Sequence, residues 1–266
     1  MRTEPSDNRL PGLKRFSILE KIPRLMHFIT TRRGGVSTGA YASLNLGEYT
    51  SDDPEAVRRN KELLCEALGM DLAQLCIPRQ VHGDEVVLLD APFPSSRPLD
   101  ADALITASPG ICLAVATADC VPLLFYDPER EVLAAVHAGW RGTALGIARK
   151  TIRRMKQTFG CNPAGILAGI GPSIGCRAFE VGEEVCGAFI ASGIDPSGIF
   201  LRDASTDRMH VDLKEANRKQ LLNEGLRREH IEVSEICTYT HHRDYFSARR
   251  EGLCSGRILT GILLKS

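Results

Sequence analysis

The chain has 266 residues, with 33 basic and 33 acidic side chains and therefore no formal net charge. Its hydrophobic share of 43% and charged share of 25% are those of an ordinary globular protein. Zero net charge argues against a dedicated nucleic-acid binder, because binding to phosphate backbones needs a basic excess.

No segment approaches the ~18 consecutive apolar residues that a membrane-spanning helix needs. The first residues contain no apolar stretch of the kind found in secretory signals, so we expect a cytoplasmic protein without membrane contact. The nine cysteines are scattered and form no CxxC pair. In a reducing compartment we interpret most of them as small buried hydrophobic residues, with one or two reactive or metal-bound.

The hydrophobic pattern predicts strands and helices that alternate irregularly. Residues 1–15 are polar, and we expect them to be loose. A loop rich in Gly and Ser, residues 32–47, follows the first strand; loops of this length inside a domain are often functional. Strands are expected at 22–31, 77–90 (two short strands around Gly83), 112–117, 121–126, 132–137 and 257–265, and the segments 165–175 and 235–252 are each expected to begin as a strand and continue as a loop. Helices are expected at 51–69, 142–158, 179–191 and 212–228.

The chain has no internal repeat, low-complexity tract or obvious linker. Together with the mixed order of elements, this predicts one α+β domain over residues 1–266 with mixed β-sheets. No helix shows a long exposed apolar stripe, which favours a monomer.

Three metal-ligating side chains stand where apolar strands run into turns. They are His82 in QVHG, Cys120 in TADC and His137 in AVHAGWRG. Their separations of 38 and 17 residues are not those of a zinc finger. Strand ends, however, are where a rigid scaffold presents groups to a ligand, so the three predict a site with one open coordination position. They also fit three separate core positions, because Cys and His are often buried.

A second interpretation uses only Cys120 and His137. A thiol and an imidazole, with Asp119 nearby, make a nucleophile and its base, which predicts a cysteine hydrolase without a metal. His82 distinguishes the two interpretations, since it has a role only as a metal ligand.

Several arginines lie beside glycine or aromatic residues. Arg32 opens the Gly-rich loop, Arg141 follows Trp140, and Arg249 lies in YFSARREG. Arginine is suited to a bidentate grip on phosphate or carboxylate, although surface charge explains many single arginines. The pair His241 and His242 lies in a polar stretch, and we expect both to be exposed.

These blocks occur together in one known family. TTRRGGVSTGAYASLNLG, QVHG, DADALIT, ATADCVPLLFYDP, AAVHAGWRGT, GIGPSIG with FEVGEEV, and YFSARREG with GR resemble the YfiH-type family from about residue 26 onward. This family is described as multicopper polyphenol oxidase-like proteins, purine nucleoside phosphorylases and peptidoglycan editing factors. One departure is GCRAFEVG, where many members have two adjacent cysteines and this chain has Cys176 alone. A multicopper arrangement built on those cysteines is therefore in doubt.

The resemblance implies a four-layer αββα sandwich and a Zn²⁺ site, with Cu²⁺ as the alternative metal, formed by His82, Cys120 and His137. It implies phosphorolysis of adenosine, inosine, guanosine and methylthioadenosine, and deamination of adenosine. The partners would then be a purine nucleoside and phosphate.

From that implied function we expect further residue roles. Asp119 or Asp102 would shuttle a proton. Phosphate would be held by arginines and the nucleoside by small polar side chains; the candidates are Arg32, Arg141, Arg249, Ser37 and Asn45. Two alternatives stay open: a metal-free Cys–His hydrolase that edits peptidoglycan precursors, and a copper-dependent polyphenol oxidase.

Overall fold

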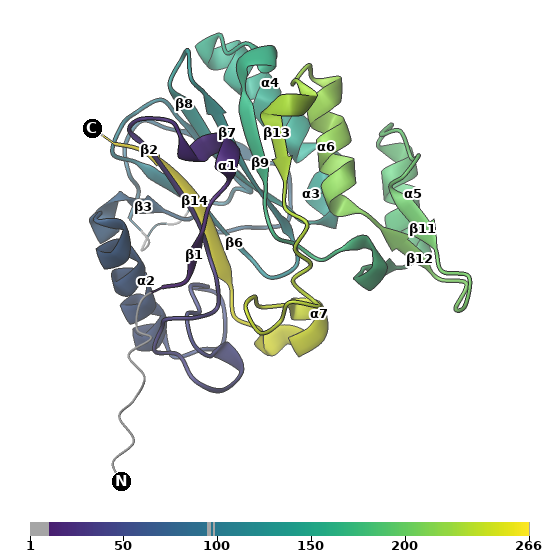
Figure 1. Cartoon of the computed structure of the whole chain (residues 1–266), viewed down its shortest axis with the longest axis horizontal. Helices are drawn as coiled ribbons and strands as arrows, with labels where there is room; N and C mark the ends of the chain where they lie inside the picture. Colours follow the sequence, from purple (N-terminus) through teal and green to yellow (C-terminus); the bar gives the residue numbers. More distant parts are fainter. Residues whose placement is uncertain (1–10, 95–96, 98, 266) are drawn as a thin grey trace.

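Two large β-sheets form the centre of the molecule. The computed structural model describes residues 11–94, 97 and 99–265 (Figure 1). The five-stranded sheet has the order β1-β2-β14-β6-β3, with bounds Leu13–Lys14, Leu25–Thr30, Ile258–Leu264, Cys112–Thr117 and Leu75–Cys76. The six-stranded sheet has the order β13-β9-β7-β8-β5-β4, with bounds Ile231–Val233, Leu167–Ile170, Val121–Asp127, Val132–Ala138, Ala103–Thr106 and Val86–Leu89. Both sheets contain parallel and antiparallel pairs.

Helices lie outside the two sheets, and a small third sheet lies at one side. The α-helices are α1 Ser17–Glu20, α2 Pro54–Leu68, α3 Trp140–Leu145, α4 Ile147–Phe159, α5 Glu183–Ala191, α6 Leu213–Asn223 and α7 Ala248–Glu251. The third sheet has the order β10-β12-β11, with bounds Glu180–Val181, Met209–Val211 and Phe200–Arg202. In Figure 1 it projects together with α5 from the right-hand side.

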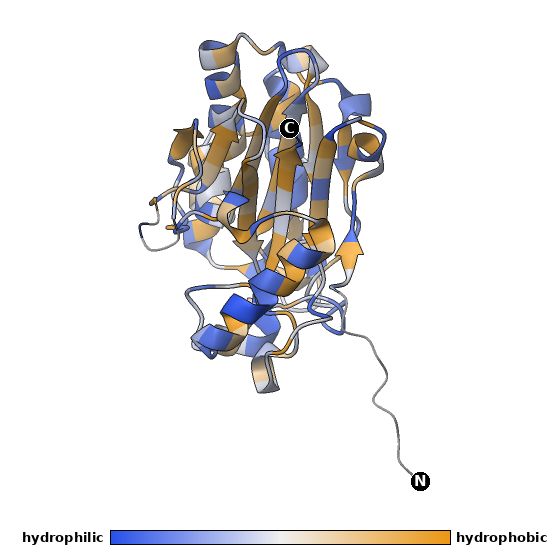
Figure 2. Cartoon of the chain, turned by 90° about the vertical axis from the view of Figure 1, so that its left-hand side faces the viewer, coloured by the Kyte–Doolittle hydropathy of each residue, from blue (hydrophilic) through white to orange (hydrophobic). Residues whose placement is uncertain are grey.

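The strands are apolar on both faces because each sheet is covered on both sides. Along β8, Ala134 and Val136 pack with α4 and α6, whereas Leu133 and Ala135 pack with the five-stranded sheet. The far side of the five-stranded sheet packs on α2, through residues such as Leu64. The layers therefore run α2, five-stranded sheet, six-stranded sheet, then α4 and α6, and Figure 2 shows the largely apolar strands between more polar helices. The predicted four-layer α+β sandwich is confirmed.

Several expected elements have nearly the observed bounds. The strands predicted at 112–117, 121–126 and 132–137 are β6, β7 and β8. Helix α2 begins after Asp53, whose side chain accepts a hydrogen bond from the Glu55 N–H, and ends at Gly69 in the left-handed conformation. Asp212 caps α6 in the same way, by accepting from the Glu215 N–H.

Other boundaries differ from expectation, for local reasons. The helix predicted at 142–158 begins at Trp140 and breaks into α3 and α4 at Gly146, whose φ is +81°. The helix predicted at 179–191 begins only at Glu183, after a β10 strand that pairs with β12. The strand expected at the start of the segment 235–252 lies upstream of it, at β13.

Two further expectations need correction near the N-terminus and in the segment 77–90. Residues 13 and 14, expected to be loose, form β1 against β2; residues 1–10 lie outside the described part of the chain. Of the two strands expected around Gly83, only β4 forms as a strand. The backbone around Gly83 instead donates its hydrogen bonds to a side chain, as described below.

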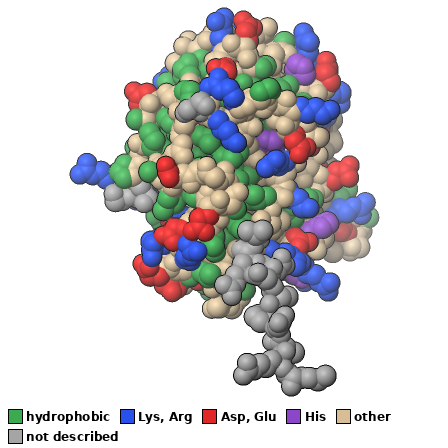
Figure 3. Space-filling model, turned by 60° about the vertical axis from the view of Figure 1, so that its left-hand side comes forward, with side chains coloured by type: hydrophobic (Ala, Val, Ile, Leu, Met, Phe, Trp, Pro, Cys, Tyr) green, Lys and Arg blue, Asp and Glu red, His purple; other side chains and the backbone are tan. Residues whose placement is uncertain are grey.

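No helix in the described part of the chain is long and apolar enough to cross a membrane. On the face shown in Figure 3, basic and acidic side chains are interspersed, as expected from the zero net charge.

Candidate metal centre

Strand pairing brings Cys120 and His137 together at one end of the central strands of the six-stranded sheet. β7 begins at Val121, directly after Cys120, and runs antiparallel to β8, so that Pro122 lies opposite His137. β5 begins next to them, because Ala103 pairs with Val136 on the other side of β8. Asp102, which precedes β5, accepts the hydrogen bond of the His137 backbone N–H at 2.7 Å through its own backbone carbonyl. Three strand ends therefore meet at one point.

The fully buried carboxylate of Asp102 connects His137 to the turn that carries His82. Its Oδ1 lies 2.7 Å from Nδ1 of His137 and accepts the backbone N–H of His82 at 3.0 Å. Its Oδ2 accepts the N–H groups of Gly83 at 2.7 Å and Val81 at 3.3 Å. Because a carboxylate accepts, Nδ1 of His137 must carry the proton, and its Nε2 is the nitrogen left for a ligand.

The QVHG turn is also held from its other side. The amide of Gln80 donates to the Ala116 carbonyl at 2.8 Å and accepts the Ala116 N–H at 2.7 Å, so it replaces a neighbouring strand on β6. His82 then takes a left-handed conformation with φ +58°, which is uncommon for a residue with a side chain. The residue before Cys120, Asp119, is also left-handed, at φ +87°. The uncommon backbone conformations at His82 and at the residue before Cys120 set the directions of the His82 and Cys120 side chains, which converge.

His82, Cys120 and His137 converge into a single ligand set. One nitrogen from each ring and the Cys120 Sγ all lie within 4.8 Å of one another. The two imidazole rings stand nearly perpendicular, with centroids 4.8 Å apart. Burial increases across the group: His82 is exposed, Cys120 is intermediate and His137 is buried. Within the described residues this is the one group of three His, Cys or acidic side chains that could hold a metal ion.

Two glycines of AVHAGWRG make room for this group. A Cβ at Gly139 would lie 3.2 Å from the Cys120 Sγ and 3.3 Å from a ring carbon of His82. A Cβ at Gly142 would lie 2.8 Å from the Gly83 carbonyl oxygen, so glycine there lets α3 pack directly on the His82 turn. The residues present thus fit a metal: they supply soft and borderline donors and leave open the space at their centre.

The charges of the group are coupled. Burial raises the pKa of the Cys120 thiol, but the neighbouring rings of His137 and His82 outweigh burial and lower it to about 6. Burial lowers the pKa of His137, but Cys120 and Asp102 outweigh that effect and raise it to about 9. Burial raises the pKa of Asp102, and its hydrogen bonds with His137, Gly83 and His82 bring it below its usual value. The thiol is therefore readily available as a thiolate, the form that binds metals and acts as a nucleophile.

A cavity of about 290 Å³ opens beside the three side chains. All three line it, together with Gln80, Thr117 and Arg257, which sequence reasoning did not single out. The remaining lining residues are Gly47, Glu48, Tyr49, Thr50, Ile77, Pro78, Ala116, Ala118 and Ala248.

Arg257 extends over Gly47 into the cavity. A Cβ at Gly47 would lie 2.6 Å from Cγ of Arg257, so glycine is needed for the arginine to pass. Its Nη1 donates to the carbonyls of Ser255 at 2.6 Å and Gly256 at 2.9 Å. Among the described residues, its Nε and Nη2 have no acceptor within hydrogen-bond distance. Three N–H donors are thus available to a ligand. The only sequence signal was the GR pair before the closing strand.

Thr117 contributes a hydroxyl without a partner among the described residues. The side chain is 2% exposed, yet its Oγ1 has no hydrogen-bond partner there. An unsatisfied buried hydroxyl is costly, and it lines the cavity, so a ligand would satisfy it.

The five expected substrate-binding residues do not line this cavity in the described structure. Arg32 is occupied: it donates to the carbonyls of Ala42 and His242 and to Glu251. Ser37 and Asn45 are buried and donate to Asp52, at 2.6 Å and 2.9 Å. These hydrogen bonds brace the Gly-rich loop.

The other two expected arginines are exposed and lie against aromatic rings. The guanidinium of Arg141 lies 4.2 Å from the ring centre of Trp140, and that of Arg249 lies 5.2 Å from the ring centre of Phe179. As expected, His241 is exposed, whereas His242 is partly buried, with its Nδ1 unpartnered in the described structure.

Asp119 has a different environment from the one expected of a proton shuttle. Its Oδ1 accepts the Thr238 hydroxyl at 2.6 Å, and its Oδ2 accepts the Ser247 hydroxyl at 3.0 Å and the Arg249 N–H at 2.7 Å. These three donors tie the segment 238–249 to the residue before Cys120.

Comparison with known proteins places the chain in a family. Residues 26–265 match the family model described as multi-copper polyphenol oxidoreductase laccase. A purine nucleoside phosphorylase of Bacteroides thetaiotaomicron is 44% identical, over 97% of each chain. Adenosine deaminase RL5, from an unknown prokaryotic organism, is 37% identical, over 95% of this chain and 99% of that protein. The crystal structure of the hypothetical protein YfiH of Bacillus licheniformis has a TM-score of 0.90 and 33% identity, covering 97% of this chain and 98% of that one. The chain therefore belongs to the multi-copper polyphenol oxidoreductase laccase family, the family of the YfiH proteins.

Proposed function

We propose that the protein is a zinc-dependent purine nucleoside enzyme that cleaves purine nucleosides with phosphate and deaminates adenosine. The observation that carries this proposal is the presence of two binding features in one cavity: the ligand set His82, Cys120 and His137, and the available donors of Arg257. Relatives over nearly the whole length are named purine nucleoside phosphorylase and adenosine deaminase.

The donor set favours zinc. Zinc binds both thiolate sulfur and imidazole nitrogen, and its catalytic sites use three protein ligands and keep a fourth position open. When bound, the ion would supply Lewis-acid activation at the purine end of the substrate. Asp102 fixes the Nδ1–H tautomer of His137 and also accepts a hydrogen bond from the His82 backbone. It therefore fixes the positions of two of the three ligands relative to each other.

Arg257 is our proposed phosphate anchor, in place of the arginines expected from sequence. In phosphorolysis a phosphate oxygen forms a bond to ribose C1′ while the bond from C1′ to the purine nitrogen breaks, and the electron pair leaves with the base. A guanidinium with available N–H groups on two nitrogens can grip two phosphate oxygens and offset the repulsion between the dianion and Cys120. Thr117 offers a further hydroxyl to the nucleoside.

The test is metal analysis of the purified protein, paired with chromatography of adenosine incubated with and without phosphate. We expect about one zinc per chain, adenine with ribose 1-phosphate when phosphate is present, and inosine from deamination. His82→Ala should lose zinc and both activities, whereas His241→Ala, which changes an exposed histidine outside the cavity, should lose neither. Arg257→Met should retain zinc and lose phosphorolysis more than deamination. Zinc-free protein with full activity would refute the proposal.

A second candidate rests on a specific observation. Cys120, His137 and Asp102 also have the arrangement of a nucleophile, a base and an orienting acid, so a metal-free hydrolase acting on cell-wall precursors fits the same geometry. For that enzyme His82→Ala would be mild, and thiol alkylation of metal-free protein would abolish activity.

Copper-dependent phenol oxidation is the third possibility, and the family description names it. Multicopper chemistry requires several clusters of ligands, whereas the described residues contain one group of three. Copper loading of zinc-free protein, followed by an assay for phenol oxidation, tests this possibility directly.

A further inference from the structure

A tyrosine with an exposed ring lines the metal cavity. Tyr49 is 60% exposed, although it encloses the cavity together with the three metal ligands. Other large apolar side chains that the described structure exposes, such as Val81, Leu145 and Ile190, do not line this cavity. An aromatic side chain that is both exposed and part of a cavity lies at its opening, where a ligand can cover it.

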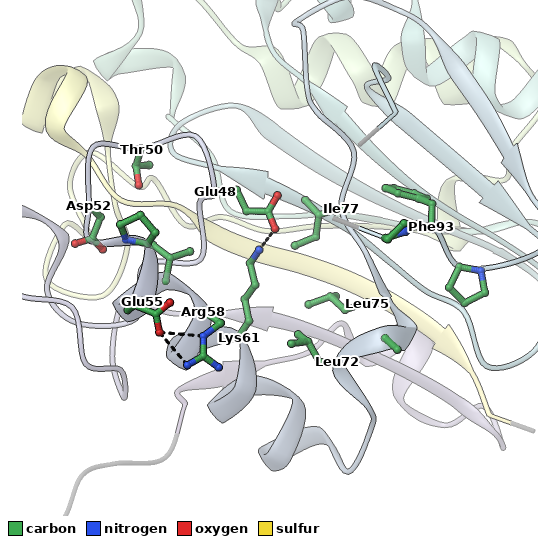
Figure 4. Close-up of a pocket in the computed structure, with 15 residues that line it drawn as sticks. Glu48, Thr50, Asp52, Glu55, Arg58, Lys61, Leu72, Leu75, Ile77 and Phe93 are labelled. Atoms are coloured by element: carbon green, nitrogen blue, oxygen red, sulfur yellow. Dashed lines mark hydrogen bonds and ion pairs between the residues drawn. The ribbon is translucent and has the colours of Figure 1, made fainter. Parts of the chain in front are cut away.

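The side chain of Tyr49 belongs to the metal cavity and not to the groove beside it. The residues on either side, Glu48 and Thr50, also line a groove of about 950 Å³ between α2 and the segment 72–94, whereas Tyr49 does not. Glu48 forms an ion pair with Lys61 on α2, which Figure 4 shows at this groove. Tyr49 is therefore directed away from the groove, toward the opening of the metal cavity.

The turn that carries Tyr49 is held by hydrogen bonds. The buried Asn45 donates from Nδ2 to Oγ1 of Thr50 at 2.9 Å, and Thr50 donates to the Gly47 carbonyl at 2.9 Å. Oδ1 of Asn45 accepts the backbone N–H groups of Gly47 at 3.0 Å and of Arg257 at 2.9 Å. One side chain thus connects the turn to the backbone of Arg257. Tyr49 and Arg257 are therefore presented to the cavity by one framework, which lowers the entropy lost when a ligand binds.

The phenol of Tyr49 lies near an ion pair that precedes the His82 turn. Burial raises the pKa of Tyr49, Glu48 and Asp100 also raise it, and Arg79 lowers it. Nη2 of Arg79 donates to Asp100 at 2.6 Å, and the Arg79 backbone N–H donates to the Leu99 carbonyl at 2.8 Å. Arg79 lies three residues before His82 in the chain. The ring of Tyr49 is therefore on the side of the cavity that carries His82.

Tyr49 gives the cavity an aromatic surface that its other walls lack. Apart from the two imidazoles of the ligand set, the remaining lining side chains are aliphatic or polar, and they include Ile77, Pro78 and Ala248. A planar base that directs an edge toward the metal ligands must lay its faces against the cavity walls. Stacking on an aromatic side chain strengthens the binding of a base by about tenfold or more.

We propose that Tyr49 stacks on the purine base and sets the affinity of the cavity for the base. This inference rests on the proposed nucleoside function and deepens it, because it assigns recognition of the base to a residue outside the ligand set. Stacking requires the ring and not the hydroxyl, so phenylalanine should replace tyrosine at this position.

The experiment measures inosine binding by calorimetry in phosphate-free buffer. Inosine lacks the amino group that deamination removes, and phosphorolysis lacks its second substrate, so neither proposed reaction consumes the ligand. Tyr49→Ala should bind inosine about tenfold more weakly than wild type, and Tyr49→Phe should bind it as wild type does. Ile190→Ala is the matched control, because Ile190 is 68% exposed but does not line the cavity; it should also bind inosine as wild type does.

A titration with inorganic phosphate alone separates stacking from general damage to the cavity. Phosphate affinity and zinc content should be the same in wild type and Tyr49→Ala, because Arg257 and the ligand set are intact. Three results would overturn the inference: unchanged inosine affinity in Tyr49→Ala, a Tyr49→Phe variant as weak as Tyr49→Ala, or a loss of phosphate affinity equal to the loss for inosine.

The outcomes also separate this inference from the proposed function. Phosphorolysis of inosine is assayed by chromatography in the same preparations. If wild type cleaves inosine and Tyr49→Ala binds it equally well, the stacking role is refuted and the proposed function stands. If inosine binding depends on the Tyr49 ring but inosine is not cleaved with phosphate, the stacking role stands and the proposed reaction is refuted. Wild-type protein that does not bind inosine refutes the stacking role.

Discussion

Two buried aspartates lie near the metal cavity, and they stabilise different parts of it. Asp102 hydrogen-bonds to the metal ligands, whereas Asp119 hydrogen-bonds to a segment that borders the cavity. Asp102 grips the metal ligands themselves, the ring of His137 and the backbone of the His82 turn. Asp119 instead anchors the segment 238–249, which borders the cavity: it accepts hydrogen bonds from the Thr238 and Ser247 hydroxyls and the Arg249 backbone N–H.

The difference shows how a fold can separate two tasks with the same residue type. On the Asp102 side, loss of the carboxylate disturbs ligand geometry and therefore metal affinity. On the Asp119 side, it loosens a segment that borders the cavity at Ala248 but supplies no ligand. Zinc affinity and protein stability should thus respond separately to changes at the two positions.

The largest effect is expected from Asp102→Asn. The amide cannot accept at every contact that the carboxylate now makes, and it leaves His137 free to take the other tautomer. We expect zinc affinity to fall about 100-fold, in the range seen when a carboxylate partner of a metal-bound histidine is removed. Competition with a chromogenic chelator measures this affinity. Unchanged zinc affinity would contradict the role that we assign to Asp102.

Asp119→Asn should lower the stability of the protein and leave its zinc affinity unchanged. Asparagine tolerates the left-handed backbone at this position, but its amide group faces the donors Ser247 and Arg249. We expect the free energy of unfolding to fall by about 2 kcal/mol, the cost of leaving buried polar groups unsatisfied. Urea unfolding of the zinc-loaded protein gives this value, and the chelator titration should show wild-type affinity. A zinc loss as large as that of Asp102→Asn would remove the distinction between the two sides.

Gly139→Ala tests the space among the ligands. The added methyl group would lie 3.2 Å from the Cys120 Sγ and 3.3 Å from the His82 ring, so one ligand must shift. We expect about a tenfold loss of zinc affinity, because overpacking costs on the order of 1–3 kcal/mol. The control is Gly165→Ala, where a Cβ would meet no atom within 4 Å. Equal affinities in the two variants would show that Gly139 is not required for the ligand set.

The smallest effect is expected from Thr117→Val, which removes the unpartnered hydroxyl but keeps the shape. If the hydroxyl contacts the substrate, kcat/KM for adenosine should fall about fivefold, the equivalent of one ordinary hydrogen bond. Thr260→Val is matched to it, because Thr260 is also fully buried with an unpartnered hydroxyl in the described structure but does not line the cavity. A similar decrease in both variants would mean that the effect comes from packing.

The sequence was sufficient to predict the strands next to two of the three ligands. The alternation of turn residues and apolar runs around β6, β7 and β8 is strong, and Cys120 and His137 stand at the ends of such runs. His82 was singled out on the same ground, although the strand expected before it does not form. Strand ends keep their relation to a sheet whatever the rest of the fold does, so this inference needed little long-range information. The family resemblance supplied the layer order.

The cavity wall was harder to predict, because the sequence does not show whether the N–H groups of an arginine are hydrogen-bonded within the protein or available to a ligand. Arg32 lies in a Gly-rich loop and looks like an anion site, but its donors are taken by the carbonyls of Ala42 and His242 and by Glu251, up to 219 residues away. Arg257 looks like an ordinary residue before a strand. Its availability depends on Gly47, which is distant in sequence.

The central position of β14 in its sheet has a consequence for folding. β14 lies between β2 and β6, two strands that are themselves more than 80 residues apart, and Arg257 directly precedes it. Contacts between segments so distant form slowly, because loop closure must come first. The three metal ligands come from residues 82–137, and none of them lies on β14. We therefore expect the ligand set to be able to assemble in a nascent chain before the phosphate anchor arrives, so that metal loading precedes substrate competence.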